Sequence, residues 1–141
     1  MAAVAITTIV ALGTLGYEYF GVKDSRASEA QVMATRLTQL LLEDWKSTGG
    51  DADYDPKTLG LGFVTPPPPA TSTCMITLDN QTFYIQLTQG LVAIPNNPDP
   101  ATGARLIRIN VTTRWRVDYA PGAITADDPS ISLTTYIRRD T

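Results

Sequence analysis

Three aspartates that alternate along a short polar segment, Asp51, Asp53 and Asp55, are the residues best placed to bind a metal ion. Carboxylates at alternate positions can converge on one hard cation, as they do in the calcium loop of an EF-hand. That loop needs glycine at its sixth position and glutamate at its twelfth, where this chain has Pro56 and Gly62. We therefore interpret the segment as a polar turn and predict no metal site.

Histidine-dependent catalysis is excluded by composition. The chain has no histidine and one cysteine, Cys74. It can form neither a Ser-His-Asp nor a Cys-His pair, and it lacks the ligands of a Cys/His zinc site. A lone cysteine cannot close an intramolecular disulfide, so we expect Cys74 to be a small buried residue at the start of a strand. We predict that the protein is not an enzyme and has no cofactor.

Two asparagines match the acceptor sequence for N-linked sugar, Asn80 before Thr82 and Asn110 before Thr112. Asn80 falls in a predicted turn, which makes it the better candidate glycosylation site; Asn110 falls on the polar face of a predicted strand. The net charge is −3, and Arg114, Arg116 and the later arginines are too scattered to form a basic cluster. We therefore predict no nucleic-acid partner.

The chain begins with an apolar segment, residues 1–24. It has no charged side chain from Met1 to Tyr17. Some 22 helical residues would span roughly 33 Å, enough to cross the hydrocarbon core of a bilayer. It could be a signal peptide, a transmembrane anchor, or a segment that begins in the membrane and ends in a protein assembly. A signal peptide is disfavoured because the basic start is missing and no break follows.

The segment 25–48 favours the third interpretation, because the helix continues into it without proline or glycine. Its apolar residues recur at steps of three and four and predict one buried stripe, flanked by Met33 and Leu40. The stripe consists of Ala30, Ala34, Leu37, Leu41 and Trp45. Gly49 and Gly50 then end a helix of about 48 residues.

After a proline-rich connector at 49–73, alternating residues predict a β-sheet at 74–139. Cys74–Leu78 and Thr82–Leu87 predict a hairpin around a short polar turn at Asp79–Gln81, with Leu91–Ile94 as a ragged continuation. Ile107–Tyr119 and Ile131–Ile137 add two strands with one buried face each.

The predicted fold class is α+β: a long N-terminal helix, apolar and then amphipathic, packed on a four-stranded antiparallel sheet. The globular head would comprise residues 25–141. Helix and sheet would share a core in which Trp45 and Trp115 are buried rather than available for binding. We predict that core to contain Met33, Leu37, Leu41, Trp45, Ile109, Val111, Trp115 and Leu133.

In this arrangement the chain resembles the type IV pilins and type II secretion pseudopilins, and is most similar to minor pilins of the pilus modification kind. The local similarity lies in Ala11–Gly16, Ser25–Arg26, Ala34–Leu41, Ile109–Trp115 and Ile131–Tyr136. The family also has a glutamate at the fifth residue after its processing site. Here the fifth residue is Ala5 and no glutamate precedes Glu18. Either residues including that site precede Met1, or the chain is an atypical member.

The resemblance implies a structural subunit of an extracellular filament, located in the inner membrane before assembly and at the cell surface afterwards. Its partners would be copies of itself and the pilus or secretion assembly machinery of the inner membrane. The small residues of the apolar half would allow close helix packing. The expected filament-core residues are Ala5, Ile9, Leu12, Gly13, Leu15, Gly16 and Phe20. A minor pilin or pseudopilin that primes or tips a filament, and a monomeric membrane-tethered binding domain, remain the alternatives.

Overall fold

The computed structural model describes residues 2–68, 72–92, 105–116 and 124–139, and side chains from residue 21 onward. The chain divides into two compact units, Met1–Val32 and Met33–Thr141. We call the second one the sheet unit. The elements are α1 (Ala2–Ser47), the 3₁₀ helix η1 (Pro56–Leu59), β1 (Cys74–Leu78), β2 (Gln81–Val92), β3 (Arg105–Trp115) and β4 (Ser130–Arg139).

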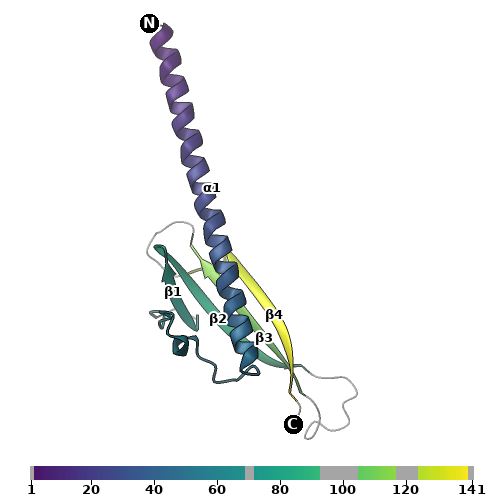
Figure 1. The fold of residues 1–141 in the computed structure, drawn as a ribbon. Coiled ribbons are helices and arrows are strands. Elements are labelled where there is room, and N and C mark those ends of the chain that lie inside the picture. Colours follow the sequence, from purple (N-terminus) through teal and green to yellow (C-terminus); the bar gives the residue numbers. More distant parts are fainter. Residues whose placement is uncertain (1, 69–71, 93–104, 117–123, 140–141) are drawn as a thin grey trace. The chain divides into compact units, whose positions relative to one another are not determined.

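The predicted fold class is confirmed at the level of one helix packed on a four-stranded antiparallel sheet. The strands follow in the order β1-β2-β3-β4, each hydrogen-bonded to the next, and the part of α1 from Met33 onward lies across one face of the sheet (Figure 1). In this order every strand pairs with its neighbour in sequence, so β1 and β4 form the two edges of the sheet.

The hairpin between β1 and β2 turns on two residues, Asp79 and Asn80, rather than on the predicted three. Both have positive φ, 46° and 67°. Such a turn matches the twist of the strands that it joins, and aspartate and asparagine tolerate its left-handed backbone. Gln81 is therefore the first residue of β2, which continues without interruption to Val92.

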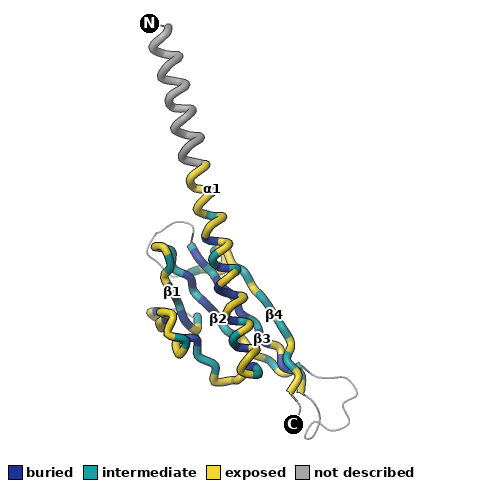
Figure 2. Tube along the Cα trace, viewed as in Figure 1, coloured by how far each residue is buried: buried dark blue, intermediate teal, exposed yellow. Residues whose placement is uncertain are grey.

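The buried residues of the sheet unit lie where α1 passes over the strands (Figure 2). In β3 these are the odd-numbered residues 107 to 115, and every one of them is buried, as the predicted period of two requires. On the helix, Ala34, Leu37, Leu41 and Trp45 are buried, as is Ala30 before them. The predicted helical stripe is therefore confirmed.

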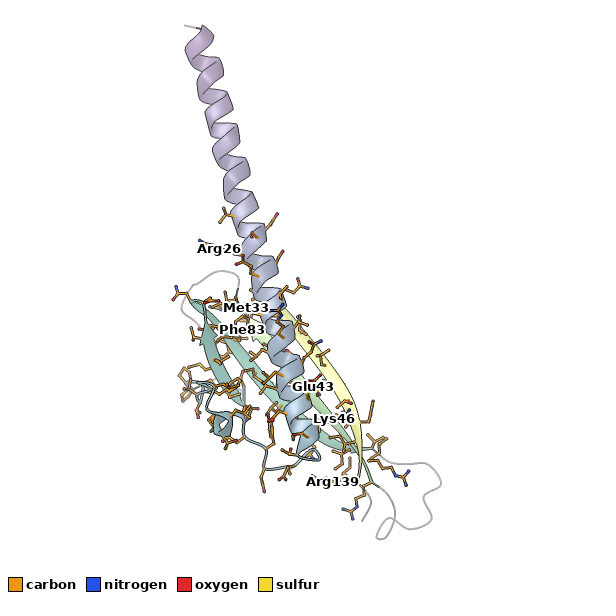
Figure 3. All side chains as sticks on the ribbon, in the orientation of Figure 1. Arg26, Met33, Glu43, Lys46, Phe83 and Arg139 are labelled. Carbon is orange, nitrogen blue, oxygen red and sulfur yellow. The ribbon has the colours of Figure 1, made fainter. Side chains whose placement is uncertain are left out.

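The helix ends through two glycines. Gly49 and Gly50 have φ of 71° and 67°, and the Gly50 N–H donates to the Trp45 carbonyl at 2.9 Å. A left-handed residue after the last turn satisfies carbonyls that have no partner within the helix. The Nε of Arg139, a residue labelled near the end of β4 in Figure 3, also donates to the Gly49 carbonyl at 2.7 Å. Helix end and sheet edge are thereby joined.

The connector is more regular than predicted. Asp55 caps η1 by accepting the Lys57 N–H, Pro56 stands in its first turn, and Gly60 ends it at φ 68°. Val64 then forms an isolated antiparallel bridge with Met75 of β1. Pro56 therefore starts a helical turn within a segment that was predicted to be irregular. The predicted strand residues Val117 and Tyr119, and Ile94 of the predicted continuation, lie outside the described residues.

Candidate functional site

The residues predicted to pack a filament core all belong to α1, but their side chains lie outside those described. This applies to Ala5, Ile9, Leu12, Gly13, Leu15, Gly16 and Phe20. In the part of the chain that the structure describes, no helix is both long enough and apolar enough to cross a membrane.

Most of the residues predicted to join helix and sheet are buried in the sheet unit. The buried ones are Leu37, Leu41, Trp45, Ile109, Val111 and Trp115. Met33 and Leu133 are half-buried, and both lie near the margin of the interface: Met33 begins the sheet unit on α1 and Leu133 belongs to the edge strand β4.

A polar contact at the centre of this interface was missed by the sequence interpretation. Thr38 and Thr113 are both fully buried, and their hydroxyl oxygens form a hydrogen bond of 2.8 Å between α1 and β3. Thr38 stands four residues after Ala34 and three before Leu41, so its spacing placed it in the stripe. Its polarity concealed it, because the stripe was traced from apolar residues alone.

Two of the three aspartates after the helix, Asp51 and Asp55, are explained by local structure. The Asp51 carbonyl accepts the Trp45 Nε1–H at 2.7 Å, and the Asp55 carboxylate caps η1 and lies 3.2 Å from Lys57 Nζ. The Lys57 N–H, together with the Lys57 ammonium, holds the pKa of Asp55 below its usual value. Within the described ranges no three potential ligands gather into a metal site.

A stacked aromatic pair stabilises the chain where it leaves the helix. Trp45 and Tyr54 lie with ring centroids 5.5 Å apart and planes 12° from parallel. The Tyr54 hydroxyl donates to Asp44 Oδ2 at 2.7 Å. Burial, and then this hydrogen bond, raise the pKa of Tyr54 above its ordinary value. The pair therefore folds the connector back onto the helix end and leaves Trp45 3% exposed.

Cys74 is fully buried at the start of β1, as predicted. Burial, with a smaller contribution from the Asp55 charge, raises the pKa of the Cys74 thiol to about 11. Because the thiolate is the reactive form, this cysteine is inert in the folded protein near neutral pH.

The two asparagines of the acceptor sequences have different surroundings. Asn80 is exposed at the tip of the β1–β2 hairpin. The Asn110 side chain is half-buried and donates through Nδ2 to Ser132 Oγ at 2.8 Å and to Thr134 Oγ1 at 2.7 Å. Asn80 is thus the accessible one of the two.

The face of the sheet that points away from α1, which we call the outer face, carries mainly hydroxyl, amide and guanidinium groups. It includes Tyr84, Gln86, Thr88 and Gly90 of β2, Arg108, Asn110, Thr112 and Arg114 of β3, and Ser130, Ser132, Thr134, Tyr136 and Arg138 of β4. Its polar centre was predicted from the alternation, but the spatial relation of its two tyrosines to its arginines was not.

The opposite, inner face is not equally covered along its width. The inward residues of β3 are buried, whereas those of the edge strand β4, among them Ile131, Leu133 and Ile137, are half-buried. On α1, Leu40 is 43% exposed. Apolar surface of the sheet unit therefore remains accessible beside the helix on the β4 side.

Comparisons with known proteins assign no family to the chain. No protein-family model, curated protein or solved structure matches the chain.

Proposed function

We propose that the chain is a structural subunit of a type IV pilus-like extracellular filament, assembled through the apolar first part of its helix. The observation that carries the proposal is the single helix Ala2–Ser47, which links an uncharged N-terminal segment directly to the amphipathic segment on the sheet. A tethered binding domain would usually have a flexible linker at this point, so the unbroken helix favours an assembled role.

The composition of the two helix segments supports assembly through the first segment and packing of the second on the sheet. The amphipathic segment has its partner within the chain, since its stripe from Ala34 to Trp45 is buried. An apolar segment without charges needs a partner too, either lipid or apolar helices of other copies. The membrane would bury this segment before assembly, and the apolar helices of neighbouring subunits would bury it afterwards.

The accessible apolar surface beside the helix offers a second contact for neighbouring copies. Leu40 is 43% exposed, and the inner side of β4 is half-buried. Residues of this kind gather at surfaces where proteins associate. The head of one subunit could therefore contact the next through surface that its own core leaves accessible.

A paired substitution tests the assembly role in cells that make the chain. Leu12→Asp places a charge in the predicted filament core, whereas Leu61→Asp makes the same change at an exposed connector residue. We expect Leu12→Asp to remove the chain from surface material sheared off the cells and Leu61→Asp to leave it there. Equal recovery of both variants in the sheared fraction would contradict the proposal.

The two alternatives predict different results for the unmodified chain. A minor pilin or pseudopilin that primes or tips a filament would occur in trace amounts within fibres of another protein. A monomeric tethered domain would stay with the membrane fraction and form no fibres. As a subunit of the proposed filament, the chain would lie in the inner membrane before assembly, contact the assembly machinery there and reach the cell surface afterwards.

A further inference from the structure

The strands of the sheet form a basic surface on an acidic chain. None of the four strands contains aspartate or glutamate, while β3 contributes Arg108 and Arg114 to the outer face and β4 contributes Arg138. The whole chain has a net charge of −3. The outer face is thus complementary to an anionic ligand.

Two tyrosine–arginine pairs stand at opposite ends of this face. Tyr84 lies directly across from Arg114, and Tyr136 directly across from Arg108. Arg108 and Arg114 are six residues apart on β3, which corresponds to about 20 Å. Tyr136 is 55% exposed, and the Arg114 Nε is buried without a hydrogen-bond partner among the described residues. Each pair places a tyrosine and an arginine at directly opposed positions of the outer face, and Arg114 Nη1 also donates to the Thr125 carbonyl at 3.3 Å.

The polar centre between the pairs is fixed by its own hydrogen bonds. Asn110 donates to Ser132 and Thr134, and Thr112 donates to Asn110 Oδ1 at 2.9 Å and has its Oγ1 3.0 Å from Ser132 Oγ. These bonds join β3 to β4 and hold the side chains in one arrangement. A ligand that used their remaining donors and acceptors would lose little side-chain entropy in ordering them.

We propose that the outer face binds an acidic polysaccharide, a polymer of sugars that carry carboxylate groups. Arginine binds a carboxylate through two parallel hydrogen bonds. Hydroxyl and amide side chains match the hydroxyls of sugars, and the apolar side of a sugar ring can lie against a tyrosine ring. The length of the face suits several consecutive sugars. This inference requires only the sheet unit and does not depend on assembly into a filament.

The arrangement of the tyrosines favours a polysaccharide over single-stranded nucleic acid. Single strands bind where successive bases stack on neighbouring aromatic rings along a basic groove. Here Tyr84 and Tyr136 are at opposite ends of the face and on different strands, with hydroxyl and amide groups between them. Single-stranded nucleic acid is therefore the alternative ligand that the experiment has to distinguish from an acidic polysaccharide.

Binding can be measured on the full chain, purified in a mild detergent, by calorimetric titration with polygalacturonate. We expect binding that weakens as sodium chloride is added, because the contacts are partly ionic. Dextran, which has no charge, should not bind, and oligodeoxythymidine should bind more weakly than polygalacturonate. Absence of polygalacturonate binding, or tighter binding of the oligonucleotide, would overturn the proposal.

Substitutions test whether binding of polygalacturonate depends on the outer face or only on the net charge of the chain. The double variant Arg108→Gln with Tyr136→Ser should weaken polygalacturonate binding by about tenfold or more. Arg36→Gln removes the same charge from an exposed position of α1 and should leave binding unchanged. Thr88→Asp, at an exposed position of the face, should give the same loss through repulsion and provides a second test if the double variant does not fold. Equal losses in Arg36→Gln and the outer-face variants would show unspecific attraction and contradict the site.

Discussion

Thr38 of α1 and Thr113 of β3 form a hydrogen bond of 2.8 Å between their hydroxyls, at a place where both residues are completely buried. The Thr38 hydroxyl also lies 2.6 Å from the Ala34 carbonyl oxygen. The other buried side chains of α1 are apolar, and their contacts with the sheet are not directional. This pair therefore selects one register of the helix on the sheet, since a shift along the helix would leave the buried Thr113 hydroxyl without this partner.

Thr38→Val should lower the free energy of unfolding by about 1–3 kcal/mol, because Thr113 is left buried with an unpaired hydroxyl. The double variant Thr38→Val with Thr113→Val removes both hydroxyls and should recover part of this loss. Urea unfolding followed by tryptophan fluorescence measures the difference, since Trp45 and Trp115 are 3% and 5% exposed. Additive losses in the double variant would show that the two hydroxyls do not depend on each other.

Gly50→Ala should destabilise the sheet unit more than Gly60→Ala. Both glycines have a left-handed backbone, with φ of 67° and 68°, which costs about 1–2 kcal/mol for alanine. At Gly50 a Cβ would also lie 2.9 Å from Ile137 Cδ1 and 3.4 Å from Ile109 Cγ2, so these side chains would have to shift, which adds to the cost. At Gly60 nothing lies within 4 Å.

The same urea titration measures both glycine variants, with Gly60→Ala as the control for backbone strain alone. Equal midpoints for the two variants would mean that the helix end does not pack against β3 and β4 as closely as the structure indicates.

Cys74 should make stability decline at alkaline pH. Burial raises the thiol pKa from 9.0 to about 11 in the folded state, so the unfolded chain loses this proton first. The contribution is complete below pH 9 and is lost as the pH rises towards 11, with a total of at most about 3 kcal/mol. Unfolding titrations from pH 8 to 11 measure the slope. In Cys74→Ala the slope should be shallower, and an unchanged slope would assign the effect to other groups such as Tyr54.

The inert thiol of Cys74 also allows contacts between filament helices to be probed. In the variant Ile9→Cys, a short bifunctional maleimide should join neighbouring chains within fibres, because packed helices lie about 8–10 Å apart. Gel electrophoresis under denaturing conditions should then show covalent dimers. The control Leu61→Cys, exposed on the connector, should give few or none. Dimers that are absent from Ile9→Cys fibres would contradict packing through the apolar segment.

Much of the fold was predictable because its patterns are long and regular. The alternation in β3 and the helical stripe from Ala34 to Trp45 each extend over several turns or residue pairs, so a single exception could not hide them. Boundaries were less predictable. Asp79 and Asn80 adopt positive φ, so the turn is shorter than predicted, and Asp55 caps a 3₁₀ turn that begins at Pro56, within a connector that was predicted to be irregular.

Spatial relations across the sheet were beyond the reach of sequence patterns. The pairing of Arg108 with Tyr136 and of Arg114 with Tyr84 depends on strand register, which a two-residue period leaves open. The Thr38–Thr113 contact depends on how the helix is placed on the sheet. Neither relation connects residues that are near in sequence, so only the folded structure brings them into view.

The most direct test of the filament proposal is electron microscopy of surface material sheared from cells that make the chain, with the subunits identified by mass spectrometry. The account predicts long uniform fibres composed mostly of this chain. A sheared fraction without fibres, with the chain retained in the membrane, would contradict it.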